Sequence, residues 1–125
     1  MDTSKEYIKM CEKAKEIYEW CYETFGKYII PEYSFYIRPC DSNEVKIKLP
    51  KSDIGNCIIW LPRQDQLQEM VKLSDCVMDA LCDVSNLMKD NWKYYGFNFT
   101  SMEQLWLAFV MKEKFNKQWN GEDWI

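Results

Sequence analysis

The chain has 125 residues, of which 47% are hydrophobic and 29% are charged. This length suits one domain with one core, and the composition is typical of an ordered globular protein, which argues against disorder. With 20 acidic and 16 basic side chains, the net charge is -4, which excludes a strongly basic nucleic-acid coat protein. No apolar run is long enough for a membrane span or resembles a signal peptide, so we expect a single cytoplasmic domain, residues 1–125.

Apolar residues at helical spacing predict a first helix over residues 3–25, closed by Gly26. Two alternating segments, 33–38 and 44–49, then predict a β-hairpin. We expect six apolar residues to pair across it and face the core: Ile37 with Val45, Phe35 with Ile47 and Tyr33 with Leu49. A continuously apolar third strand, residues 57–61, is expected in the centre of the sheet.

The second half of the chain predicts two more helices. One follows Pro62 and runs to about Lys89, and the other runs to about Lys117. Two capping boxes are open for the start of the last helix: Thr100 with Glu103, or Ser101 with Gln104. Residues 91–99 fit either a short strand or a packed loop, and residues 120–121 (Asn-Gly) predict a turn.

Together these elements predict an α+β fold. It comprises an N-terminal helix, a three-stranded, mainly antiparallel sheet, and two C-terminal helices packed on one face of the sheet.

The residues that usually perform catalysis or bind zinc are missing. There is no histidine and no Cys-x-x-Cys pair, so the common zinc spacings and the common base for a nucleophile are absent. Glycine-rich phosphate loops are absent too. We therefore predict no catalytic residue, no metal site and no cofactor. Six cysteines could pair, but without an export signal reduced thiols are expected at Cys11, Cys21, Cys40, Cys57, Cys76 and Cys82.

Asp75, Asp79 and Asp83 recur every four residues and so form one stripe on the predicted second helix. A solvated helix face explains such a stripe most simply. It is also a candidate contact for a basic partner, or for a divalent metal in a metal-dependent hydrolase.

The outward face of the predicted hairpin carries a small basic patch with an aromatic ring: Tyr36, Arg38, Lys46 and Lys48. Such a face can hold phosphates and stack an unpaired base. Glu44 is expected opposite Arg38 and would partly cancel its charge.

Trp119 and Trp124 give the C-terminal tail an aromatic character. Packing in the core is one interpretation. A second is that they anchor a partner, because tryptophan is common at the energetic centres of interfaces.

Three segments carry a family resemblance: Trp60 to Met70, Ser101 to Met111, and Lys117 to Trp124. In their order of cap, helix and tryptophan tail they resemble small uncharacterised proteins of bacteriophages and prophages of Gram-positive bacteria. The resemblance implies an accessory product made inside a bacterial host. It transfers no active residue.

The sequence therefore favours a non-enzymatic phage or prophage accessory protein that binds a host or phage macromolecule, most simply a protein. The alternatives are a nucleic-acid-binding module that uses the hairpin and a metal-dependent hydrolase that uses the aspartate stripe.

Overall fold

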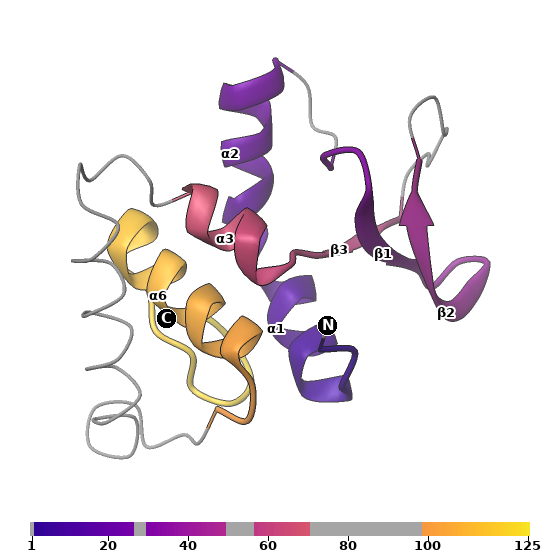
Figure 1. Cartoon of the computed structure of the whole chain (residues 1–125). Coiled ribbons are helices and arrows are strands. Elements are labelled where there is room, and N and C mark those ends of the chain that lie inside the picture. Colours follow the sequence, from indigo (N-terminus) through magenta and orange to yellow (C-terminus); the bar gives the residue numbers. More distant parts are fainter. Residues whose placement is uncertain (1, 27–29, 50–56, 71–98) are drawn as a thin grey trace. The chain divides into compact units, whose positions relative to one another are not determined.

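The computed structural model describes residues 2–26, 30–49, 57–70 and 99–125 (Figure 1). By contact, the chain divides into two compact units, Thr3–Arg63 and Gln64–Ile125, the second joined by Met1–Asp2. The described elements are α1 (Lys5–Lys13), α2 (Glu16–Phe25), β1 (Ser34–Arg38), β2 (Ser42–Lys48), β3 (Ile59–Leu61), α3 (Gln64–Met70) and α6 (Met102–Phe115). Helices at both ends of the chain and a three-stranded antiparallel sheet between them confirm the predicted α+β class.

The N-terminal segment forms two helices, so the prediction of one helix over residues 3–25 is wrong at its middle. Ala14 leaves the helical conformation with φ -86° and ψ 60°. Neither proline nor glycine marks this break in the sequence. The helix before the break makes a contact distant in sequence: the hydroxyl of Tyr7 in α1 donates to the Pro62 carbonyl at 2.6 Å. The predicted end is confirmed, since Gly26 adopts the left-handed conformation with φ 72°.

The strand order is β2-β1-β3, which places β1 in the centre of the sheet. The prediction of a central third strand is therefore wrong: β3 is a buried edge strand. Phe35 pairs with Ile47 as predicted. The register shifts after the pair Tyr36 and Lys46, so residues 43–45 of β2 lie opposite Ile37 alone.

The sheet buries the face that the sequence assigned to solvent. On this face Trp60 of β3 pairs with Tyr36 and stacks on Trp20 of α2, with 6.3 Å between ring centroids. Ser34 and Lys48, a directly opposed pair, are 0% and 7% exposed. Trp20 of α2 thus packs on this face at β3, and the Ile30 carbonyl binds the Lys48 ammonium on the same face at β2. Opposed side chains such as Ser34 and Lys48 are buried together because they lie on the same face.

The other face is buried only at its β3 side. Ile37, Ile59 and Leu61 are buried there, as predicted for Ile37. On the hairpin side the prediction is wrong, because Tyr33, Ile47 and Leu49 are 56%, 50% and 54% exposed. The apolar alternation predicts which side chains share a face of the sheet. It does not predict which part of that face other residues bury.

In the second unit, α3 packs against α6. Of the two capping boxes, the one with Ser101 is present: the Ser101 hydroxyl accepts from the Gln104 backbone N–H at 3.2 Å. The Gln104 side chain reaches back to the N–H of Thr100 at 3.0 Å. Asp2 completes this network, since its carboxylate accepts from the Ser101 hydroxyl at 2.5 Å. Among the described helices none is long and apolar enough to cross a membrane.

Candidate interaction surface on the hairpin

The predicted site residues fall into three groups, and the aspartate stripe lies outside the described residues. Asp75, Asp79 and Asp83 belong to the range 71–98, as do the greater part of the predicted second helix and residues 91–98. Within the ranges that the structure describes, no cluster of three metal-ligating side chains occurs. The stripe therefore stays a prediction.

The tryptophan tail is folded back on itself. Trp119 and Trp124 form an isolated antiparallel bridge, and their ring centroids lie 5.1 Å apart. The two side chains are 1% and 5% exposed. Asn120 makes the predicted turn, because its side-chain oxygen accepts from the N–H groups of Glu122 and Asp123. The large apolar side chain that the tail exposes is Ile125, at 71%, so a partner role for the two tryptophans stays a prediction.

The predicted basic patch does not form as a set of four exposed side chains. Lys48 is buried, and its ammonium donates to the Ile30 carbonyl at 3.0 Å. Arg38 lies opposite Ser42, not Glu44, and forms an ion pair with Asp41 at 2.7 Å. Tyr36 and Lys46 remain directly opposed and half-buried. The difference at Lys48 has a local cause: the Ile30 carbonyl binds its ammonium on the buried side of β2.

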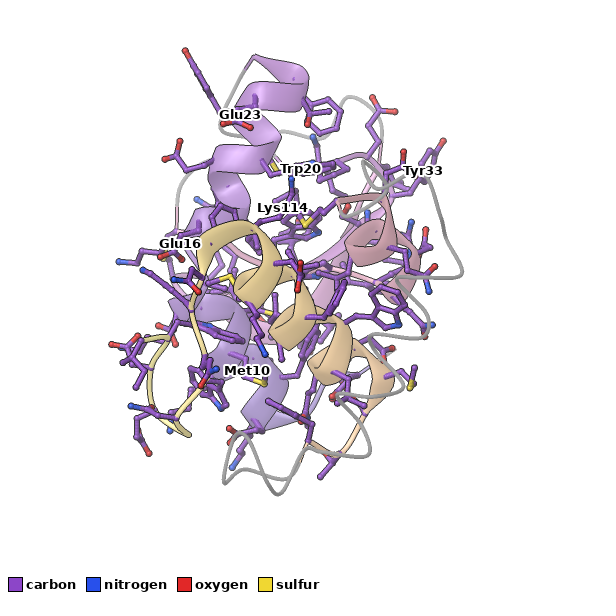
Figure 2. All side chains as sticks on the ribbon, turned by 90° about the vertical axis from the view of Figure 1, so that its left-hand side faces the viewer. Met10, Glu16, Trp20, Glu23, Tyr33 and Lys114 are labelled. Carbon is purple, nitrogen blue, oxygen red and sulfur yellow. A yellow bond between two sulfur atoms is a disulfide. The ribbon has the colours of Figure 1, made fainter. Side chains whose placement is uncertain are left out.

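Three large exposed side chains lie where the sequence predicted core. We call Tyr33, Ile47 and Leu49 the hairpin face; Figure 2 shows the Tyr33 side chain pointing outward. Tyr33 has a positive φ of 59°, which is rare for a bulky residue. Two backbone bonds hold it there: its N–H donates to the Lys48 carbonyl at 2.6 Å, and its carbonyl accepts from Arg63. The backbone that carries this exposed aromatic ring is thus strained but anchored.

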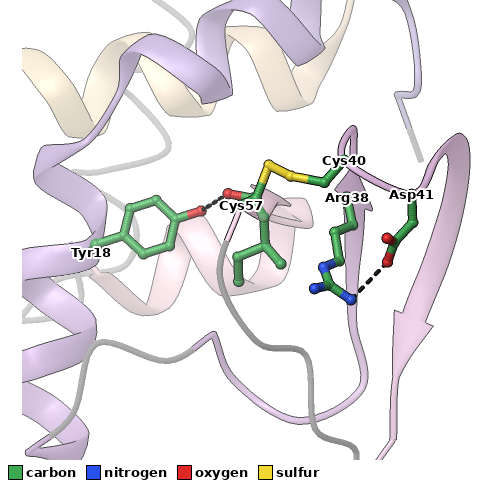
Figure 3. Close-up of a disulfide and its surroundings, with 6 residues drawn as sticks. Tyr18, Arg38, Cys40, Asp41 and Cys57 are labelled. Atoms are coloured by element: carbon green, nitrogen blue, oxygen red, sulfur yellow. Dashed lines mark hydrogen bonds and ion pairs between the residues drawn. A yellow bond between two sulfur atoms is a disulfide. The ribbon is translucent and has the colours of Figure 1, made fainter.

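A disulfide joins Cys40 and Cys57 beside the hairpin, so the expectation of reduced thiols is wrong for these two residues (Figure 3). Its origin is topological. Ile37 pairs with Ile59, which brings the turn after β1 and the segment before β3 to the same end of the sheet. The Cα atoms of the two cysteines lie 6.4 Å apart, within the usual range for a disulfide. Cys11 and Cys21 are buried and form no disulfide, and Cys76 and Cys82 lie outside the described residues.

The outer edge of β3 is closed by a side chain. The Tyr18 hydroxyl donates to the Ile58 carbonyl at 3.3 Å (Figure 3). It also accepts from the Trp60 backbone N–H at 3.0 Å. Burial raises the pKa of Tyr18 to about 12, against an ordinary value of 10.0. The phenol therefore stays protonated and keeps both bonds at neutral pH.

An open pocket of about 330 Å³ adjoins the disulfide. Its lining residues are Cys11, Glu12, Lys15, Tyr18, Pro39, Cys57, Ile58 and Ile59. The charged pair Glu12 and Lys15 is exposed, and Tyr18 is committed to the β3 edge.

Replacing Tyr18 with phenylalanine should destabilise the protein and change its alkaline unfolding. Loss of the hydroxyl leaves the Trp60 N–H unpaired, at a cost of about 1–3 kcal/mol. In the wild type the folded state keeps the phenol proton up to a pKa of about 12, whereas the unfolded chain loses it near 10.0. This part of the stability is present below pH 10 and is lost between pH 10 and 12.

Urea unfolding of both proteins between pH 8 and pH 11.5 checks this expectation. The difference in unfolding free energy between the wild type and Tyr18→Phe should become smaller as the pH rises above 10. Burial also raises the pKa of Cys21 to about 12, but both proteins share that contribution. A difference that stays constant over the whole range would show that Tyr18 is not held as described.

Comparison with family models, with curated proteins and with solved structures finds no match to this chain. Functional inference therefore depends on the chain itself. The sequence did not predict that the hairpin face is exposed. The available signal was Trp60, a large apolar side chain that lies on the other face of the sheet and stacks there on Trp20 of α2.

Proposed function

We propose that this chain is a non-enzymatic accessory protein, of the phage or prophage type that its second half resembles, and that it binds another protein through the hairpin face. The observation that carries the proposal is the exposure of Tyr33, Ile47 and Leu49 at half or more of their surface. Large apolar side chains grouped on one surface are characteristic of sites that bind a partner.

The backbone at Tyr33 supports this choice. A left-handed conformation at a bulky residue costs about 1–3 kcal/mol and is found where function requires it. Here it presents a tyrosine, one of the residues that dominate the energy of protein interfaces, to solvent. An anchored backbone also loses little freedom on binding.

A protein partner fits the surface better than a nucleic acid. Of the four predicted phosphate-binding residues, Lys48 is buried against Ile30 and Arg38 is paired with Asp41. Tyr33, Ile47 and Leu49 are exposed on the same hairpin, and the net charge of the chain is -4. Nucleic-acid binding gains most of its affinity from cations placed on phosphates, and the described part of the hairpin has lost two of these.

The test is affinity capture from a Gram-positive bacterial lysate with two matched variants, Ile47→Lys and Ile125→Lys. Both replace an exposed isoleucine with lysine, one on the hairpin face and one on the tail. A lysine at position 47 would be buried by the partner, and its charge should weaken the affinity of an apolar interface at least about tenfold. We expect Ile47→Lys to lose the retained protein and Ile125→Lys to keep it.

If both variants retain the captured protein equally, the proposal is contradicted. If Ile125→Lys alone loses the captured protein, the contact lies on the tail instead. Retention that disappears after nuclease treatment, or that falls steeply with salt, would favour the nucleic-acid alternative. Urea unfolding of each variant establishes that a lost partner does not reflect a lost fold.

A further inference from the structure

The two edges of the sheet differ. At β3 the outer N–H of Trp60 and the carbonyl of Ile58 are both bonded to the Tyr18 hydroxyl. At β2 no described strand pairs with the outer side, because the sheet order is β2-β1-β3. An edge with unpaired backbone groups is a template for another strand.

The direction of the backbone groups in β2 follows from two independent bonds. The Lys48 carbonyl accepts from Tyr33 and therefore points toward β1. The Trp60 N–H points away from β1, which leaves the backbone of its pair, Tyr36, to bond with Lys46. Because these directions alternate along a regular strand, the N–H and carbonyl groups of Ile47 point to the outer edge. Val45 follows the last regular pair, at Lys46, and we infer the same outward direction for its backbone groups.

We propose that β2 pairs with β2 of a second copy of this chain, antiparallel, with Val45 on the two-fold axis. The charge pattern supports this occupant. In that register Glu44 of each copy lies opposite Lys46 of the other, so the dimer contains the favourable pair twice. Neither side chain makes an ion pair within the described residues.

The usual protection of an edge strand is weakened here. Lysines and bulges commonly block edges. Lys48, however, is turned inward to the Ile30 carbonyl, and the charge of Lys46 meets Glu44 of the second copy. The irregular stretch 43–45 opposite Ile37 remains and limits the length of regular pairing. A short paired stretch implies a weak dimer, with Kd roughly 1 to 100 µM.

The dimer would also enlarge the surface of the proposed function. Residues directly opposed in antiparallel strands lie on the same face, so the two hairpin faces would come to lie on one side of a continuous sheet. The inference goes beyond the proposed function and does not depend on it. Its key charges, Glu44 and Lys46, alternate along β2 with Val45 and Ile47 and so lie on the side opposite the hairpin face.

Sedimentation velocity over a concentration series tests the proposal with Glu44→Lys, Lys46→Glu and the double swap. Each single variant puts like charges opposite each other twice, so we expect at least tenfold weaker association than in the wild type. The double swap should restore it. An equimolar mixture of the two single variants should also dimerise, because one copy then carries lysine at both positions and the other glutamate.

A wild type that stays monomeric through the micromolar range would overturn the proposal, and so would equal association of all variants. Leu49→Lys separates the two proposals, since it lies on the hairpin face but outside the paired stretch. It should keep the dimer and lose the captured protein. If the dimer is absent while Leu49→Lys still loses capture, the second-copy inference fails and the proposed function stands.

Discussion

Replacing both Cys40 and Cys57 with serine is expected to lower the free energy of unfolding by about 3 kcal/mol. The disulfide joins residues separated by 17 positions and encloses the whole of β2. Without the bond the unfolded chain regains the freedom of that loop, and the edge strand loses one of its connections to β3. A loss of this size is a large fraction of the stability of a small domain.

Urea unfolding followed by tryptophan fluorescence measures the effect. The wild type in reducing buffer should unfold at the same urea concentration as the double serine variant in either buffer. Both cysteines are exposed, so a reductant reaches them in the folded state. Unfolding of the wild type at the same urea concentration with and without reductant would mean that the bond does not form or does not stabilise.

The second large effect is expected at Lys48. Lys48→Glu would place a carboxylate against the Ile30 carbonyl in a buried position, where the wild type has a hydrogen-bonded ammonium. We expect a loss of at least about 3 kcal/mol, because a buried charge without a partner is among the most destabilising changes. Lys46→Glu, two positions away, is half-buried and should change stability by about 0.5 kcal/mol or less.

This pair of variants distinguishes the two faces of the hairpin directly. The measurement is chemical denaturation in dilute solution, where association of copies contributes little to the apparent stability. If both variants lose the same small amount, Lys48 is exposed, as the sequence alone suggested, and the assignment of the buried face is wrong.

Local features were predictable where a local cause exists. The left-handed Gly26, the pairing of Phe35 with Ile47, the cap at Ser101 and the Asn120 turn all follow from short-range chemistry. The break at Ala14 was not predictable in this way, because nothing in its own residue type disfavours a helix. The helices on either side of the break contact residues distant in sequence: Tyr7 bonds to Pro62, 55 positions away, and Tyr18 bonds to Ile58, 40 positions away.

The candidate surface was harder to predict than the fold. Alternation divides β1 and β2 into two faces but does not reveal that α2 carries a tryptophan for the side with Lys48. Lys48 is buried and Ile47 is half-exposed, the reverse of what the alternation predicted. The cysteine pair was missed for a related reason: the distance between Cys40 and Cys57 depends on β3 lying beside β1, which spacing in the sequence does not state.

The most direct test of the central proposal, that the hairpin face contacts another protein, is photo-crosslinking in Gram-positive bacterial cells that produce the chain. A photoreactive amino acid at position 47 should give a discrete crosslinked product. Mass spectrometry of this product should identify a protein other than a second copy of the chain. The same amino acid at position 125, which is also exposed, should give none. Crosslinks from position 125 and none from position 47 would contradict the account.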